Sequence, residues 1–107
     1  MAKKWKLSYL PLFYEDLNEA VTYISNVLEN HKAAIDLLNE TEEAIRKRLP
    51  EADEFPEYRS LRKRPHPYYT ITVKNFYVFY VVIETKKEKV MEVRRFLYKK
   101  RDINKLI

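Results

Sequence analysis

The residues best suited to chemistry lie near the end of the chain, where a basic run surrounds two aromatic rings. From Arg94 to Arg101 the sequence reads RRFLYKKR. Cations beside aromatic rings suit the phosphates and stacked bases of single-stranded RNA. In an RNA-cleaving site, arginine or lysine would stabilise transition-state charge and a tyrosine would help to transfer protons. The candidates for catalytic roles are Arg94, Tyr98 and Arg101.

Other side chains could extend this surface, and the charge of the whole chain is uneven. Residues 1–54 carry 7 Lys/Arg and 11 Asp/Glu, whereas residues 55–107 carry 14 Lys/Arg and 5 Asp/Glu. A field of one sign on half of a small domain favours an acidic or polyanionic partner, although excess charge also serves solubility alone. The candidates for binding nucleic acid or a target are Arg62, Lys63, Arg64, Lys74, Phe96, Lys99 and Lys100. The alternative is that the rings complete the sheet surface while the cations stay hydrated.

Composition excludes several other kinds of site. The chain has no cysteine and no glycine, and its only histidines are His31 and His66. Little material is therefore present for a metal site, a Ser-His-Asp constellation or a glycine-rich phosphate loop, and we expect no cofactor. No apolar run approaches the roughly 18 residues that span a bilayer, and the N-terminus lacks the apolar core of a signal peptide. One cytoplasmic domain over residues 1–107 is expected.

The first half of the chain predicts one strand and two helices. Apolar and polar residues alternate from Lys4 to Leu10, as in a half-buried strand. Pro11 fits the first turn of a helix that ends near Asn30, and a second helix follows until Pro50. With so short a link the two helices should form an antiparallel hairpin. The apolar positions that define their buried faces are Phe13, Leu17, Ala20, Val21, Ile24, Val27 and Leu28, then Ala34, Leu38, Thr41, Ile45 and Leu49.

The second half predicts three strands, over residues 69–74, 76–83 and 90–98, with a tight turn at Lys74-Asn75. The middle strand is apolar on both faces, which suits an interior position. A loop or short helix closes the chain. The fold class is therefore α+β in the order β-α-α-β-β-β, with a helical hairpin packed on one face of a mainly antiparallel four-stranded sheet.

Alternation along the last strand also predicts which side chains meet the helices. Met91, Val93, Arg95 and Leu97 form the more apolar set and should face the helices. Arg94, Phe96 and Tyr98 should then lie on the open face of the sheet, followed directly by the cations of residues 99–101.

The element order and two stretches, VKNFYVFYVVIE and VMEVRRFLYKKRDINKLI, resemble the RelE/ParE superfamily. These proteins are the toxins of bacterial type II toxin–antitoxin modules, also known as plasmid stabilisation modules. Their typical strand, polar turn and final strand with a basic ending match residues 75–83, 84–89 and 90–107. Arg101-Asp102 stands at the terminal "R-D" position of that pattern, and the resemblance covers nearly the whole chain.

The resemblance implies one of two activities. ParE-like members poison DNA gyrase without cutting nucleic acid, whereas RelE-like members are endoribonucleases that cut messenger RNA on the ribosome. Arg101 matches the terminal arginine of the family, Tyr98 stands where a catalytic aromatic or histidine would be, and Lys74 could contact phosphate. Tyr77, however, replaces an arginine that RelE-like nucleases often carry. The resemblance thus favours gyrase poisoning, with the endoribonuclease as the alternative and a non-toxic binding module as a third reading.

The resemblance also implies a partner, a cognate antitoxin that wraps the toxin and covers its basic surface. The positive balance of residues 55–107 predicts that the antitoxin segment is acidic and amphipathic. Because such binding depends partly on charge, salt should weaken it.

Overall fold

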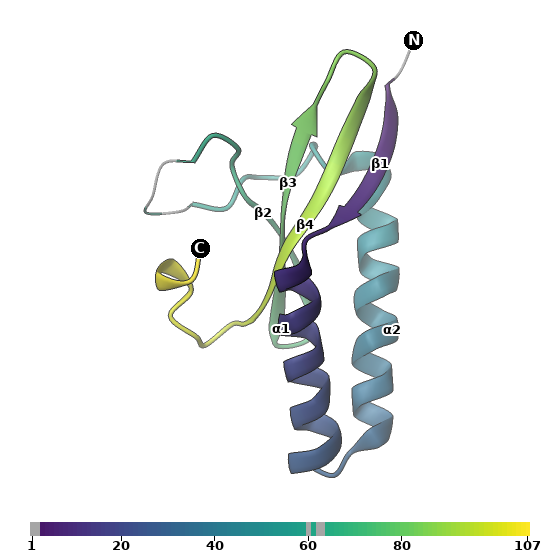
Figure 1. The fold of residues 1–107 in the computed structure, drawn as a ribbon, viewed down its shortest axis with the longest axis vertical. Helices are drawn as coiled ribbons and strands as arrows, with labels where there is room; N and C mark the ends of the chain where they lie inside the picture. Colours follow the sequence, from purple (N-terminus) through teal and green to yellow (C-terminus); the bar gives the residue numbers. More distant parts are fainter. Residues whose placement is uncertain (1–2, 60, 62–63) are drawn as a thin grey trace.

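Two helices form a hairpin on one face of a four-stranded sheet in the computed structural model, which describes residues 3–59, 61 and 64–107 (Figure 1). The order β-α-α-β-β-β, predicted from the sequence, is confirmed. Within the described part of the chain, no helix has the length and apolar character to cross a membrane. The elements are β1 Lys4–Tyr9, α1 Pro11–Thr22, α2 His31–Arg48, β2 Tyr69–Val73, β3 Phe76–Glu84 and β4 Glu88–Tyr98.

The sheet is mixed, with the strand order β1-β4-β3-β2. β3 pairs antiparallel with β2 and β4, while β1 runs parallel to β4 from Lys4 opposite Glu88 to Tyr9 opposite Val93. The predicted interior place of β3 is confirmed, since its alternate side chains enter two different apolar clusters. The long connection through the helical hairpin brings the first and last strands together.

α1 does not end as a regular helix. A π-helical turn, Tyr23–Val27, continues it, and the amide of Leu28 donates to the Tyr23 carbonyl over 3.1 Å. The wider turn carries Val27 and Leu28 away from the buried face, and they are 64% and 56% exposed. The prediction that these two side chains are buried was therefore wrong. Glu29 follows in the left-handed region with φ of +50°.

α2 begins at an Asn30 cap, whose side chain accepts from the amide of Ala33 over 3.0 Å. Its buried face contains Ala34, Thr41 and Ile45 as predicted, but Leu37 rather than Leu38 fills the remaining position. Leu37 lies three residues after Ala34 and four before Thr41, which keeps it on the same stripe of the helix.

The main core lies between the hairpin and the sheet. Phe13, Leu37 and Ile45 from the helices pack against a sheet face that includes Tyr80 and Val93. The Tyr80 hydroxyl donates to the Ala52 carbonyl over 2.8 Å and accepts from Arg48 over 2.9 Å. Burial raises the pKa of the Tyr80 phenol, partly opposed by Arg48.

A bulge in β4 reverses the faces of its second half. Phe79 of β3 lies opposite Arg95 and Tyr80 lies opposite Val93, so Arg94 is an extra residue without a partner on β3. Before this bulge, Val93 faces the helices as predicted. After it, Phe96 does so, 2% exposed, with its ring edge-on to Phe13 at 6.2 Å.

The predicted faces of the residues after the bulge were therefore wrong. Phe96 and Tyr98 lie on the helix side, against Phe76, whereas Leu97 belongs to the cluster on the opposite face. Strict alternation places them correctly only when no residue is inserted, because one extra residue moves every later side chain to the other face.

The face away from the helices is not bare. We call residues 99–107 the C-terminal segment. Figure 1 shows this segment on the opposite side of the sheet from α2. Its Ile103 and Ile107 are 7% and 4% exposed and pack in one cluster with Phe79 and Leu97. Tyr58 and Tyr68, from the loop before β2, complete this second core. The expected open face of the sheet is thus covered by the chain itself.

Candidate functional site

The second half of β4 has a free edge on the side of β1. The Leu10 amide donates to the Val93 carbonyl over 2.9 Å, and β1 makes no further pair beyond that point. Asp16 of α1 takes over there, since its Oδ2 atom accepts from the Phe96 amide over 3.0 Å. A carboxylate on a helix therefore satisfies a strand amide that would otherwise lack a partner.

The same carboxylate holds Arg95. The Arg95 Nε and Nη2 atoms donate to the two oxygens of Asp16 over 2.7 and 3.0 Å, and Nη1 donates to the Leu106 carbonyl over 3.0 Å. The bonds to Asp16 raise the pKa of Arg95, against the opposing effect of desolvation. Because bidentate pairs of this kind fix geometry, Asp16 and Arg95 join α1, β4 and the C-terminal segment.

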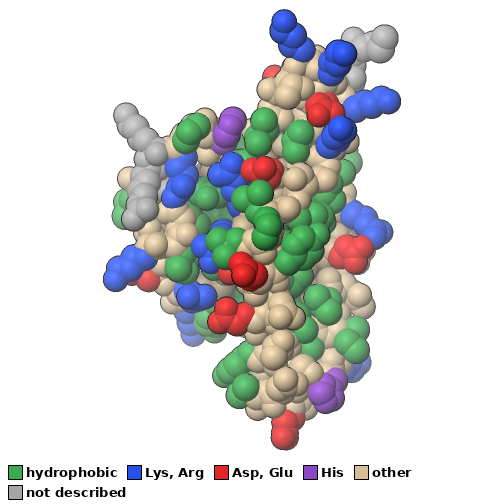
Figure 2. All heavy atoms as spheres, viewed as in Figure 1, with side chains coloured by type: hydrophobic (Ala, Val, Ile, Leu, Met, Phe, Trp, Pro, Cys, Tyr) green, Lys and Arg blue, Asp and Glu red, His purple; other side chains and the backbone are tan. Residues whose placement is uncertain are grey.

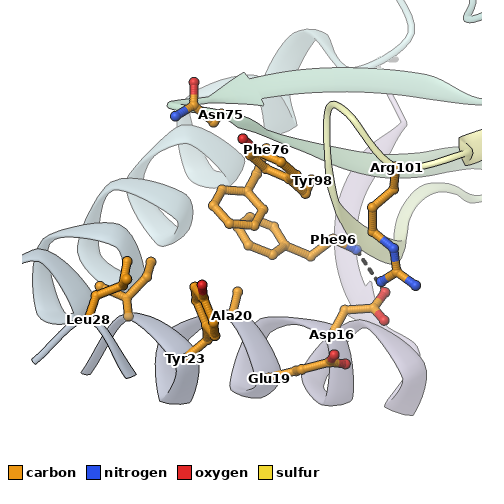
Figure 3. A pocket seen from close by; sticks show the side chains of 11 residues that line it. Asp16, Glu19, Ala20, Tyr23, Leu28, Asn75, Phe76, Phe96, Tyr98 and Arg101 are labelled. Carbon is orange, nitrogen blue, oxygen red and sulfur yellow. Dashed lines mark hydrogen bonds between the residues drawn. The ribbon is translucent and has the colours of Figure 1, made fainter. Parts of the chain in front are cut away.

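We call the Asp16–Arg95 pair the clamp. A cavity of about 580 Å³ opens beside it, between α1 with its π-helical turn, the start of β3 and the end of β4 (Figure 3). Its base is aromatic: the rings of Phe76 and Phe96 stack with centroids 4.6 Å apart and planes 11° apart. Tyr23 and Leu28 line the opposite side, and Figure 3 shows the Tyr23 ring directed toward the two phenylalanines. The cavity is therefore mainly apolar.

The rim of the cavity carries polar groups of both signs. Tyr98 is 38% exposed there, and Figure 3 shows the Arg101 side chain at one end of the cavity, directed toward Asp16. Glu19 lies one turn further along α1, and Asn75 closes the far end, where its carbonyl accepts from the Lys99 amide over 2.9 Å. A cavity with an apolar base and a few polar groups at the rim is typical of a binding site.

The structure brings together only some of the candidate residues. Tyr98 and Arg101 share the rim, and Phe96 forms part of the base. Arg94 lies in the bulge and pairs with Glu92 over 2.9 Å, so it does not join them. Lys100 is exposed on the C-terminal segment.

The remaining candidates lie apart from the cavity. Lys74 lies 3.7 Å from Glu40, Lys99 lies 5.3 Å from the centre of the Tyr77 ring, and Arg64 stands over the Tyr68 ring. Arg62 and Lys63 are outside the described residues. The cations therefore spread over several surfaces.

Folding also cancels part of the charge contrast between the two halves of the sequence. Asp16, Glu40 and Asp53 from the acidic half pair with Arg95, Lys74 and Lys89 from the basic half. On the face shown in Figure 2, Lys and Arg side chains lie at the end of the molecule near the N-terminus and the β3–β4 turn, on the side of the C-terminal segment, and beside α2. Within the described part of residues 55–107, the cations without a carboxylate partner are Arg59, Arg64, Lys86, Lys87, Lys99, Lys100 and Arg101.

The arrangement suits binding of apolar side chains better than binding of phosphate. A phosphate site needs several donors directed at one point, whereas Arg101 shares its rim with Asp16 and Glu19. The described residues also contain no group of three or more His, Asp or Glu side chains that could hold a metal ion.

Sequence reasoning missed Asp16 and Tyr23. Asp16 lies three residues after Phe13 and four before Ala20, on the apolar stripe of the helix. A charged residue on that stripe was the available signal, because it needs a buried partner. Tyr23 had no comparable signal, since its place depends on the π-helical turn.

Comparison with known proteins adds no relative, because neither a protein-family model nor a curated protein matches this chain. Its function is therefore inferred from its own residues and their geometry.

Proposed function

We propose that this protein is the growth-inhibiting toxin of a type II toxin–antitoxin module. It acts in the bacterial cytoplasm, is neutralised by a cognate acidic antitoxin, and poisons DNA gyrase by binding it, in the manner of ParE-like proteins. Support comes from the resemblance of residues 73–84 and 90–107 to that superfamily, on a fold with the element order β-α-α-β-β-β.

The observation that carries the choice of mechanism is the cavity with Tyr98 and Arg101 at its rim. An apolar base of two phenylalanine rings favours the side chains of a protein over a sugar-phosphate backbone. A target held through such a surface need not be cut, and the toxin then acts by occupying it.

The distribution of cations favours the same choice. Ribonuclease activity would need Arg94 and Lys74 near Arg101, but Glu92 and Glu40 pair with them elsewhere. The endoribonuclease remains the second candidate, because Tyr98 and Arg101 do lie close together and two lysines follow Tyr98 directly.

Induced expression in a bacterial host without an antitoxin tests the proposal. We expect growth arrest, inhibition of supercoiling by purified gyrase, and intact translated messages. Cleavage of messages within arrested cells would overturn the gyrase mechanism in favour of the endoribonuclease. Normal growth at full expression of folded protein would overturn the toxin proposal and favour a non-toxic binding module.

A pair of matched variants connects the activity with the cavity. Arg101→Gln removes the charge at the rim, and Lys100→Gln removes the same charge one residue away, where the side chain does not line the cavity. Arg101→Gln should abolish growth arrest, whereas Lys100→Gln should retain it. Equal effects of the two variants would show that net charge, rather than the cavity, sets the activity.

A further inference from the structure

We propose that the cavity is the anchor site for an acidic segment of a partner protein, which inserts one aromatic side chain and sets a carboxylate against Arg101. This inference rests on the proposed function, because the partner is then the cognate acidic antitoxin. It adds the chemistry by which the partner is recognised and the direction in which its segment lies.

The aromatic side chain of the partner segment is inferred from the residues at the base and walls of the cavity. The stacked Phe76 and Phe96 rings are joined by Tyr98, tilted by 58° at 5.6 Å from Phe76. A further ring could extend this group edge-on or offset, the arrangements that aromatic pairs prefer. Tyr23 and Leu28 are 54% and 56% exposed at the cavity, so an inserted side chain would remove them from water.

Size agrees with such an occupant. Cavities of about 300–1,000 Å³ hold most compact ligands, and the volume here is about 580 Å³. That space accommodates an indole or phenol ring together with part of the peptide on either side. A single methyl-sized side chain would leave most of the cavity unfilled.

The carboxylate of the partner segment is inferred from the charges at the rim of the cavity. Asp16 lines the same cavity as Arg101, but Arg95 and the Phe96 amide already occupy its oxygens. Arg101 makes no side-chain hydrogen bond or ion pair with any residue that the structure describes. Because Arg95 balances the charge of Asp16, Arg101 is free to bind a carboxylate supplied by a partner.

Glu19 gives the segment a direction. It lies on the α1 side of the rim and is exposed there, away from the C-terminal segment (Figure 3). A partner carboxylate placed near Glu19 would be repelled, whereas one placed near Arg101 would be attracted. The acidic end of the segment therefore points toward the C-terminal segment of this protein.

Three capped tripeptides test this recognition without knowledge of the partner. The probe is acetyl-Glu-Trp-Glu-amide, and its controls are acetyl-Gln-Trp-Gln-amide, which lacks charge, and acetyl-Glu-Ala-Glu-amide, which lacks the ring. Binding is followed by the amide shifts of the full-length protein in nuclear magnetic resonance titrations. We expect the probe to bind in the millimolar range and to shift the amides of Ala20, Ile24 and Tyr98, with each control at least about fivefold weaker.

Matched variants then test whether Arg101 binds the carboxylate of the probe. Arg101→Gln should reduce probe affinity to that of the uncharged control, whereas Lys100→Gln should change it by less than about twofold. Glu19→Gln should strengthen binding of the probe by about twofold, because it removes the repulsion. The amide spectrum of each variant shows directly that it is folded.

Three results would overturn the inference: no shift around the cavity, equal binding of the probe and its uncharged control, or equal loss in Arg101→Gln and Lys100→Gln. Growth arrest is measured separately. If the protein arrests growth but fails these titrations, the toxin proposal stands and the anchor fails. If the probe binds as expected in a protein that leaves growth unchanged, the anchor chemistry stands and its partner is not an antitoxin or gyrase.

Discussion

The two halves of β4 are built by different rules. Residues 88–93 lie between β1 and β3 and follow regular alternation, so that Met91 and Val93 face the hairpin. Residues 95–98 come after the bulge, pair only with β3 on one side, and rely on Asp16 for the other. Both halves contribute to the core, but only the irregular half also lines the cavity, through Phe96 and Tyr98, and leads to Arg101.

This difference explains how the candidate site arises. A continuous β1 would cover the edge of β4 and leave no room for the cavity beside Phe96. Because β1 stops at Tyr9, α1 crosses the free edge and its π-helical turn closes the cavity from the opposite side. The irregular half thus provides the Phe96 ring at the base of the cavity and the Tyr98 side chain at its rim.

The largest expected effect tests the reversal of faces. Phe96→Ala should lower the free energy of unfolding by about 3–5 kcal/mol, because Phe96 is buried between the helix and sheet. Urea denaturation measures this loss. Tyr98→Ala, on the same face but 38% exposed, should cost clearly less.

A double-mutant cycle identifies the face directly. Phe96→Ala and Phe13→Ala should be coupled by about 0.5–1.5 kcal/mol, since the two rings meet edge-on. Independent losses from these two substitutions would mean that Phe96 does not face the hairpin, and the two halves of β4 would then be alike.

The next effect tests the clamp at the free edge. Asp16→Ala leaves the Arg95 guanidinium and the Phe96 amide without their carboxylate. We expect a loss of about 2–3 kcal/mol, near the lower end for a broken buried ion pair because Arg95 keeps some contact with water. The unfolding free energy in urea provides the measurement.

Asp36→Ala is the control for that substitution. It removes an aspartate from the other helix of the hairpin, where Asp36 pairs with Lys32 on the exposed surface. Its unfolding midpoint should stay close to that of the unmodified protein. Similar losses at both positions would show that Asp16 has no special role at the edge of β4.

The regular elements could be predicted from the sequence because each depends on a local pattern. The hairpin and the interior β3 follow from apolar periodicity, and the Lys74-Asn75 turn follows from the residues between two strands. The bulge at Arg94 could not be predicted, since the insertion of one residue leaves no mark on composition. Once it was missed, the faces of Phe96 and Leu97 were reversed.

The candidate site was predictable only in part for the same reason. Tyr98 and Arg101 were recognised from their types and from the family resemblance. Asp16 and Tyr23 meet them through contacts between distant parts of the chain, which no local pattern encodes. Pairing between the acidic and basic halves likewise depends on the fold, so the charge contrast of the sequence overstated the basic surface.

A smaller effect, seen only in alkaline solution, tests the core beside the regular half, where Tyr80 of β3 lies opposite Val93. Burial raises the pKa values of Tyr80 and Tyr69, which face each other across β2 and β3. Unfolded phenols ionise near pH 10, so above that pH the unfolded state binds fewer protons and the protein loses stability as pH rises.

Tyr80→Phe should therefore reduce the slope of stability against pH above about pH 10. It should also lower stability at neutral pH, because the bonds to Ala52 and Arg48 are lost. Urea unfolding at a series of pH values measures both changes. A slope that Tyr80→Phe leaves unaltered would exclude this phenol as a source of the alkaline loss.

The smallest effect concerns the turn that borders the irregular half. Lys74 has a φ of +52°, in the left-handed region that glycine adopts without a steric penalty. Lys74→Gly should stabilise the protein by about 0.5 kcal/mol, since relief of that penalty exceeds the added entropy of the unfolded chain. Glu29→Gly, with φ of +50° at the helix link, is the matched control and should give a similar gain.

The Asn75 carbonyl in this turn accepts from the Lys99 amide, so hydrogen exchange at the Lys99 amide separates two outcomes. If Lys74→Gly speeds that exchange while Glu29→Gly does not, the irregular half of β4 depends on the rigidity of the Lys74-Asn75 turn. Equal exchange in both variants would mean that Asp16 and β3 are sufficient to hold the irregular half in place.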